Sequence, residues 1–206
     1  MRRLLTVAIL GILVELIGVR PSVSAVPNPA TSFVSPCFVS CPQGDIAFTV
    51  IVRDAANAPE PGASVILDFG DCPGTTFCAA QEPGTTIDPS LRHVGRIADA
   101  SGTAIFHARV GGLCSGAQMR VIADGVVLAL RNVASMDQDG NLVVDAADQA
   151  LVAGKVGGTD PSANFDCSGM VDAADQTAFA SHLGHLCDAT TPVLPRTWGR
   201  LKVTYR

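Results

Sequence analysis

The sequence predicts a mainly β fold with a small α-helical part, in which an antiparallel β-sandwich is followed by two copies of a loop–helix unit. Three observations lead to this prediction. Apolar and polar residues alternate with a period of two in short runs between residues 46 and 133. Turn-forming Gly, Pro and Asp separate these runs. The six-residue segment at 144–149 recurs unchanged at 171–176, and such self-similarity indicates a repeated structural unit.

Composition narrows the possible functions. The chain has 206 residues, a formal net charge of −5 and a hydrophobic content of 48%, which suits one medium-sized domain and a small module. An acidic chain of this size is a poor candidate for binding nucleic acid or anionic membrane surfaces. Acidic side chains are, in contrast, the ligands that hard cations prefer.

The N-terminus has the features of a signal peptide at residues 1–25. Arg2 and Arg3 precede an apolar run over 4–19, and Val-Ser-Ala at 23–25 offers small residues for cleavage. We expect bacterial-type export and a mature protein that is secreted or held at the cell surface. The alternative is a membrane anchor, but the run is short and interrupted by Glu15; no other segment is long enough to span a bilayer.

The Pro- and Ser-rich residues 26–44 are predicted to form a leader segment, and residues 45–134 the sandwich. Residues 70–90, rich in Gly, Pro and Thr, are predicted to be a long loop. The predicted strands lie, in order, at 46–53, 63–69, 92–98, 103–110, 118–123 and 126–133. The turns between them are predicted at 57–62, 99–102 and 124–125. Short strands at this spacing favour an antiparallel sandwich.

Three segments of this region resemble bacterial Ig-like domains of the invasin and intimin type. They are 52–54 (Val-Arg-Asp), 59–65 (Pro-Glu-Pro-Gly-Ala-Ser-Val) and 99–106 (Asp-Ala-Ser-Gly-Thr-Ala-Ile-Phe). The family pattern is a strand ending in Asp, a Pro-x-Pro-Gly turn and a later D-x-x-G-x-A hairpin. The resemblance implies an Ig-like β-sandwich over 45–134. It implies no particular ligand, because such sandwiches serve both as spacers and as binding modules.

The repeated segments lie in two acidic loops with the ligand spacing of an EF-hand calcium loop. Positions 1, 3, 5, 7, 9 and 12 of the first loop are Asp137, Asp139, Asn141, Val143, Asp145 and Asp148. The same positions of the second loop are Asn164, Asp166, Ser168, Met170, Asp172 and Asp175. Position 7 contributes its backbone carbonyl, so an apolar side chain is tolerated there. The sequence therefore predicts two Ca²⁺ sites, one in each loop.

The first loop departs from the pattern at position 6, where Gly normally provides a left-handed turn. Position 6 is Leu142, and Gly140 lies two residues earlier. Either the loop is distorted, or Gly140 takes position 6 in a longer loop with Asp148 at position 14. At position 8 we expect two β-branched residues, Val144 and Val171, to pair the two loops across a short ladder. Helices are predicted to follow at 149–156 and 176–183.

The order of loop, helix, linker, loop and helix resembles type I dockerin modules, over residues 135–187. The resemblance implies Ca²⁺-dependent folding and an extracellular protein partner similar to cohesins. In that family, loop positions 10 and 11 contact the partner and are commonly Ser-Thr. Here these partner-binding positions are alanines: Ala146, Ala147, Ala173 and Ala174. The hydroxyl groups are missing, so an apolar partner surface, or docking onto the adjacent sandwich, would replace the usual contact.

Seven cysteines follow the signal peptide, and in an exported chain we expect disulfides. The odd number leaves one cysteine free or bonded to another chain. The sequence leaves the pairing open. Cys72 could bond to Cys78, and Cys167 to Cys187. Cys37 and Cys41 could bond to each other, or either of them could bond to Cys114. Zinc binding at the C-x₃-C pair of residues 37 and 41 is a weaker alternative, because no second half is present.

Two histidines, His182 and His185, have a spacing that suits Zn²⁺, but without a third ligand the sequence favours helix capping. His93 and His107 lie on predicted strands with no motif partner. Because no nucleophile, metalloprotease or phosphate-loop motif is present, we expect no enzymatic activity. The C-terminal tail, 188–206, is predicted to be an edge strand or a basic, aromatic recognition segment.

These observations together predict a secreted, calcium-binding, non-enzymatic docking or adhesion protein. The alternative is an accessory carbohydrate-binding or scaffold-attached component of an extracellular polysaccharide-degrading assembly. That alternative requires exposed aromatic rings on the sandwich, and residues 45–134 contain no Trp or Tyr.

Overall fold

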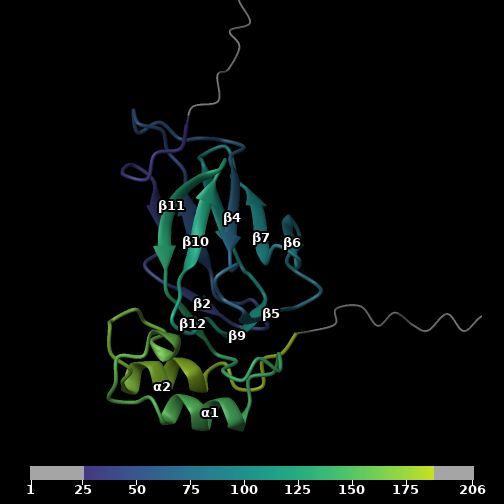
Figure 1. Cartoon of the computed structure of the whole chain (residues 1–206), viewed down its shortest axis with the longest axis vertical. Helices are drawn as coiled ribbons and strands as arrows, with labels where there is room; N and C mark the ends of the chain where they lie inside the picture. The colour runs from purple at the N-terminus through teal and green to yellow at the C-terminus, as the bar shows by residue number, and fades with distance from the viewer. Residues whose placement is uncertain (1–25, 188–206) are drawn as a thin grey trace, which may run out of the picture.

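The computed structural model describes residues 26–187 (Figure 1). The signal-peptide and tail predictions lie outside this range. The strands are β1 (Phe33–Val34), β2 (Phe38–Ser40), β3 (Phe48–Ile51), β4 (Ser64–Asp68), β5 (Gly74–Phe77), β6 (Thr85–Asp88), β7 (His93–Ile97), β8 (Thr103–Phe106), β9 (Val110–Leu113), β10 (Met119–Ala123), β11 (Val126–Arg131) and β12 (Val133–Ser135). The helices are α1 (Ala146–Ala153), the 3₁₀ turn η1 (Pro161–Ala163) and α2 (Ala173–Ala180). The mainly β fold class is confirmed.

Two antiparallel sheets form the larger part of the molecule. One has the order β11-β10-β4-β7-β6, and the other has the order β1-β3-β8. Two short pairs, β12 with β2 and β5 with β9, lie beside the helices at one end (Figure 1). The inward residues of both sheets share one hydrophobic core, as the period-two alternation predicts.

The register of the five-stranded sheet explains why the alternation is so regular. Val121 pairs with Leu67, and Leu67 pairs with Val94. All three side chains have no exposed surface, so they form one buried row across three strands. Asp124 and Gly125, both with positive φ, make the tight turn between β10 and β11, as the hairpin prediction required.

Several short strands differ from the sequence prediction. Residues 26–44 are not a separate leader, because they contain β1 and β2, which pair with β3 and β12. Phe38 packs edge to face against Phe48 and Phe69 in the sandwich core. The predicted loop at 70–90 contains β5 and β6. Strands of two to four residues are too short to produce a periodic signal.

The helical part packs on the sandwich without a linker. Its hydrophobic cluster includes Val152 of α1 and Phe179 of α2, together with Cys41, Ala134 and Met136 from the end of the sandwich. Both helices begin three residues earlier than predicted, since the acidic residue before each one acts as its N-cap. Among residues 26–187, no helix is long and apolar enough to cross a membrane.

Three disulfides connect distant parts of the chain: Cys37–Cys167, Cys72–Cys114 and Cys78–Cys187. The short-range pairings considered from the sequence are therefore wrong. The bridged residues lie 130, 42 and 109 positions apart, so the tertiary fold, not sequence spacing, brings them together. The first and third bridges join the sandwich to the helical part. Cys41 remains unpaired and buried.

We predict that digestion of the unreduced protein will release three linked peptide pairs that match these bridges. Because only 1% of Cys41 is exposed, its thiol should react with an alkylating reagent only after denaturation. Mass spectrometry of the alkylated digest checks both points. A linked peptide that joins Cys72 to Cys78, or Cys167 to Cys187, would contradict this arrangement.

Candidate metal centre

Two loops with the same internal hydrogen bonds precede the helices. Loop 1 (137–148) follows β12, and loop 2 (164–175) follows η1. In loop 1, Asp145 caps α1 by accepting a 2.7 Å hydrogen bond from the N–H of Ala147. In loop 2, Asp172 accepts an equal 2.7 Å bond from Ala174. The residues at position 9 therefore serve as helix caps in both copies.

The carboxylate at position 12 closes loop 1. Asp148 is fully buried, and its Oδ1 accepts hydrogen bonds from the N–H groups of Gln138 (2.7 Å) and Asp139 (3.1 Å). Its Oδ2 accepts a third from Asp145, at 2.9 Å. One carboxylate thereby joins the start of the loop to the first turn of α1 in a capping box.

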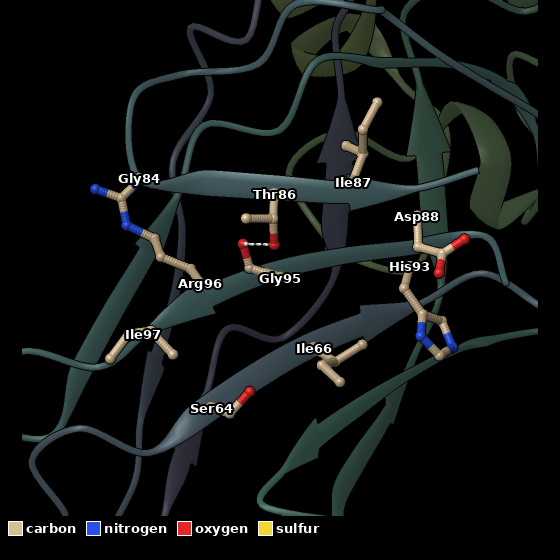
Figure 2. Close-up of a pocket in the computed structure, with 10 residues that line it drawn as sticks. All are labelled: Ser64, Ile66, Gly84, Thr86, Ile87, Asp88, His93, Gly95, Arg96 and Ile97. Atoms are coloured by element: carbon tan, nitrogen blue, oxygen red, sulfur yellow. Dashed lines mark hydrogen bonds between the residues drawn. The ribbon is translucent and has the colours of Figure 1, made fainter. Parts of the chain in front are cut away.

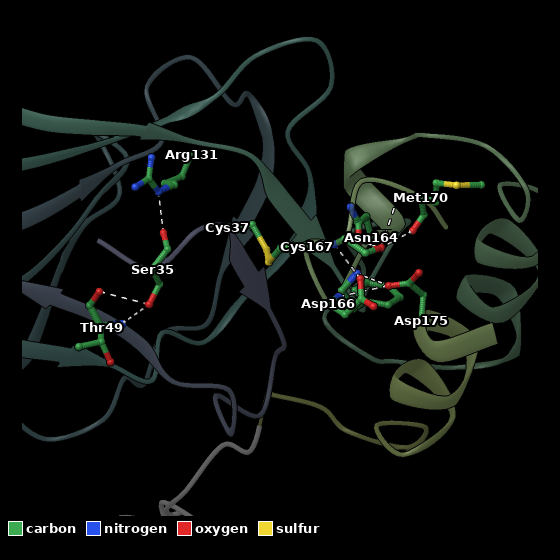
Figure 3. Close-up of a disulfide and its surroundings, with 11 residues drawn as sticks. Ser35, Cys37, Thr49, Arg131, Asn164, Asp166, Cys167, Met170 and Asp175 are labelled. Atoms are coloured by element: carbon green, nitrogen blue, oxygen red, sulfur yellow. Dashed lines mark hydrogen bonds between the residues drawn. A yellow bond between two sulfur atoms is a disulfide. The ribbon is translucent and has the colours of Figure 1, made fainter. Parts of the chain in front are cut away.

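Asp175 has the same role in loop 2. It is also fully buried and accepts hydrogen bonds from the N–H groups of Phe165, Asp166 and Asp172. Figure 3 shows its carboxylate facing the side chains that begin the loop. The same three loop positions donate hydrogen bonds to the carboxylate in both copies, although most residues of 137–143 differ from those of 164–170.

The first positions of loop 1 turn inward around one another. Asp137 accepts bonds from the N–H groups of Gly140 (2.8 Å) and Leu142 (2.8 Å). Asp139 accepts one from Asn141, whose own side-chain oxygen accepts one from Val143. As a result, carboxylate oxygens of residues 137, 139 and 148 lie within 4.8 Å of one another. Three carboxylates at this separation suit a hard divalent cation.

Loop 2 repeats this geometry with less negative charge. The side-chain oxygens of Asn164 and Asp166 both accept the N–H of Ser168, at 3.1 and 2.9 Å. The Ser168 hydroxyl donates to the carbonyl of Met170, at 3.1 Å. Figure 3 shows Asn164 and Asp166 beside the Cys37–Cys167 bridge. The oxygen donors are present, but position 1 is a neutral amide.

The backbone resolves the ambiguity over Gly140. Positions 4 and 6 are left-handed in both copies: φ is +79° at Gly140 and +68° at Leu142, and it is +62° at Cys167 and +98° at Gly169. Leu142 thus occupies position 6, and the longer-loop alternative is wrong. A non-glycine residue in this conformation costs about 1–2 kcal/mol, which the surrounding hydrogen bonds offset.

The expected ladder between the two position-8 valines is also wrong. Val144 exchanges 2.8 Å backbone hydrogen bonds with Gly184 and His185, which follow α2. Val171 exchanges bonds of 2.8 and 2.9 Å with residues 157 and 158, which follow α1. Each loop therefore pairs with the segment after the other copy's helix. This crosswise pairing relates the two copies by an approximate two-fold symmetry.

Asp137 carries its charge in an enclosed position against the sandwich. Its side chain is fully buried beside β9, where a Cβ added to Gly111 would lie 1.9 Å from Asp137 Oδ2. Burial raises the pKa of Asp137 to about 6, and the charge of Asp148 adds to this effect. A cation held by the loop would offset both destabilising influences.

The four alanines expected to contact a partner are all exposed, on the first turns of α1 and α2. A groove lies between the two helices. It is lined by the symmetry-related residues Gln149 and Gln176, Val152 and Phe179, and by Ala153. The apolar side chains Val143 and Met170 at position 7 are exposed as well.

Two clusters of polar residues were not foreseen from the sequence. His93 lies 3.4 Å from Asp68, which also pairs with Arg120 on the outer face of the five-stranded sheet. Cys41, Asp45, His182 and His185 meet where the sandwich joins the helical part. The spacing of His182 and His185 marked them as candidate ligands, but only the tertiary fold supplies their partners.

The outer face of the five-stranded sheet also carries a pocket (Figure 2). It lies over β4, β6 and β7, where Gly95 leaves space and the Thr86 hydroxyl donates to the Gly95 carbonyl at 3.3 Å. The residues that line it are Ser64, Ile66, Gly84, Thr86, Ile87, Asp88, His93, Gly95, Arg96 and Ile97. This set includes no Phe, Tyr or Trp, and it therefore lacks the stacking platform expected of a carbohydrate site.

Comparison of the chain with protein-family models, with curated proteins and with solved structures finds no significant match.

We predict that Asp175→Asn will lower the free energy of unfolding by about 1.5–3 kcal/mol in the presence of a chelator, because a charged acceptor of three backbone N–H groups is lost. Asp175 is a cleaner test than Asp148, since position 1 of its loop is the neutral Asn164. Urea unfolding measures the change. The control is Gln176→Ala, an exposed neighbour that should change stability by less than about 0.5 kcal/mol. An equally small effect of Asp175→Asn would contradict the closing role.

Proposed function

We propose that this chain is a calcium-binding, non-enzymatic docking or adhesion protein that acts outside the cytoplasm. The observation that carries the proposal is the pair of matching loops, in which oxygen-bearing side chains point inward and a buried carboxylate closes the ring. The Ig-like and dockerin-like assignments stay predictions from sequence motifs. The fold and the loops are compatible with them.

The ligand set of loop 1 fits Ca²⁺. Its donors are all oxygens, as a hard cation requires. The carboxylates of Asp137, Asp139 and Asp148 converge there, and the first and last of them are fully buried. When bound, Ca²⁺ would neutralise this charge and cross-link the start of the loop to α1. Loop 2 offers Asn164, Asp166 and Asp175 in the same places.

The disulfides support the extracellular part of the proposal. Three disulfides in one chain are typical of oxidising compartments, in agreement with the export expected from residues 1–25. Two of them hold the helical part against the sandwich. Both metal loops are thereby kept in place relative to the larger domain.

The docking part of the proposal rests on the exposed first turns of the two helices. Ala146 and Ala147 are exposed on α1, and Ala173 and Ala174 on α2. Small side chains allow a partner's backbone to approach closely, and the groove between α1 and α2 adds Val152 and Phe179 as an apolar floor. An apolar protein surface is therefore the partner chemistry that this face fits. The approximate two-fold symmetry presents the same short surface twice.

We predict that the exported chain, residues 26–206, will bind Ca²⁺ and become more stable to heat. At a free Ca²⁺ concentration 100 times the dissociation constant, one site adds about 2.7 kcal/mol, which corresponds to about 5–10 °C in Tm for a chain of this size. Calorimetric titration and thermal unfolding, each with and without chelator, measure uptake and stability.

Two variants assign the loops. Asp139→Asn should weaken uptake at loop 1, and Asp166→Asn should weaken uptake at loop 2. Asp99→Asn is the matched control, because Asp99 is an exposed carboxylate that accepts hydrogen bonds within a hairpin turn. Absence of Ca²⁺ uptake, or equal uptake by all four proteins, would overturn the calcium assignment.

We predict that Ala147→Arg combined with Ala174→Arg will abolish retention of the extracellular partner, since two long cationic side chains would then project from the proposed contact face. Affinity capture from culture fluid, with Ca²⁺ and with chelator, provides the measurement. Ala56→Arg, in the exposed turn between β3 and β4, is the control and should retain the partner. Retention by the double variant would place the contact elsewhere.

A further inference from the structure

Four metal-ligand side chains from distant parts of the sequence meet at the junction of sandwich and helices. Cys41 and Asp45 belong to the segment between β2 and β3, and His182 and His185 follow α2. None of them belongs to the calcium loops. Ligand atoms of Cys41, Asp45 and His185 all lie within 4.8 Å of one another, and His182 approaches the same Asp45 oxygen as His185 does.

Three separations between donor atoms, two from Asp45 and one from Cys41, are close to those around a tetrahedral zinc ion. Asp45 Oδ2 lies 3.4 Å from His182 Nε2 and 3.3 Å from His185 Nδ1. Cys41 Sγ lies 3.5 Å from the same Nδ1. In a tetrahedral site with ordinary Zn–ligand bond lengths, nitrogen and oxygen ligands are about 3.3 Å apart, and nitrogen and sulfur about 3.6 Å.

The hydrogen bonds of His182 orient its free nitrogen towards this point. Its Nδ1 lies 2.7 Å from the carbonyl of Ala178, which can only accept, so the proton is on Nδ1. Its Nε2 then faces the carboxylate of Asp45, 3.4 Å away, and is the ring nitrogen left to bind a cation. Metal-binding histidines commonly donate their other N–H to a carbonyl in this manner.

Cys41 has the features of a metal-bound thiol. Cys41 is the cysteine that takes no part in a disulfide, whereas the other six form three disulfides. Only 1% of its surface is exposed. Its sulfur lies 3.5 Å from Nδ1 of His185, and a coordinated metal ion deprotonates a thiol outright.

We infer that Cys41, Asp45, His182 and His185 bind one Zn²⁺ ion in a tetrahedral site. Two nitrogens, a sulfur and one oxygen suit zinc, whereas the oxygen-lined loops suit calcium. With four protein ligands, the site is structural in type. It would fasten the segment after α2 to the sandwich, next to the carbonyl of His185 that accepts the N–H of Val144 in loop 1. The inference does not depend on calcium binding.

Cobalt(II) provides the test, because tetrahedral Co²⁺ absorbs visible light and a cobalt–thiolate bond adds a near-ultraviolet charge-transfer band. The exported chain with intact disulfides is first stripped with chelator, then saturated with Ca²⁺ and titrated with Co²⁺. We expect one equivalent to bind with both spectral features, and Zn²⁺ to displace it. Binding without the thiolate band, or no binding, would overturn the assignment and leave the calcium proposal untouched.

Variants identify the ligands. Cys41→Ser should abolish the thiolate band, and both Cys41→Ser and His182→Gln should weaken Zn²⁺ binding by at least about 100-fold, beyond the loss typical of outer-shell changes. His93→Gln is the matched control, because His93 also lies 3.4 Å from a carboxylate but has no cysteine beside it; it should bind normally. If Asp45 and the histidines form only ion pairs, the two cluster variants will bind zinc as the native chain does, and the inference fails. The cobalt spectrum of the native chain remains decisive if a variant does not fold.

Discussion

Two buried carboxylates, Asp148 and Asp175, determine the structure of the helical part. Each accepts three backbone N–H groups, two from the start of its loop and one from the residue that caps the following helix. A buried charge is tolerated only when its hydrogen bonds are satisfied, so the loop has to close around the carboxylate in one way. That closure turns the earlier side chains inward and starts each helix. It also aims Val152 and Phe179 into a common core.

The parts of the fold that the sequence predicted are those with a repeating local signal. The alternation in β10 and β11, with Asp124 and Gly125 between them, predicted a hairpin in nearly the right place. The internal repeat predicted two equivalent loops, and Leu142 adopts the backbone of the glycine it replaces. Very short strands, long-range disulfides and the cluster around Asp45 were not predictable, because each depends on contacts between segments far apart in the chain. Val144 and Val171 show the same limit: their burial could be expected, but their pairing partners could not.

The junction between sandwich and helices is a shared interior. Asp137 rests against Gly111 of β9, and Cys41 and Met136 belong to the same hydrophobic cluster as the helices. A partner bound at the alanine turns would therefore be held in a fixed orientation relative to the sheets. The same junction combines two donor chemistries, oxygen in the loops and nitrogen with sulfur beside Asp45. Zn²⁺ and Ca²⁺ would therefore bind at separate sites in one small protein.

The disulfides also determine how the protein would carry mechanical tension. Consider a pull between residue 26 and residue 187. The shortest covalent path runs to Cys37, crosses to Cys167 and continues through α2 to Cys187. A longer path runs from Cys37 through β3 and β4 to Cys78 and crosses to Cys187. Loop 1 and strands β6, β7, β10 and β11 lie outside both paths. The part of loop 2 from Cys167 onwards lies with α2 on the shorter path, so under force the second loop would yield first and the first loop would be shielded.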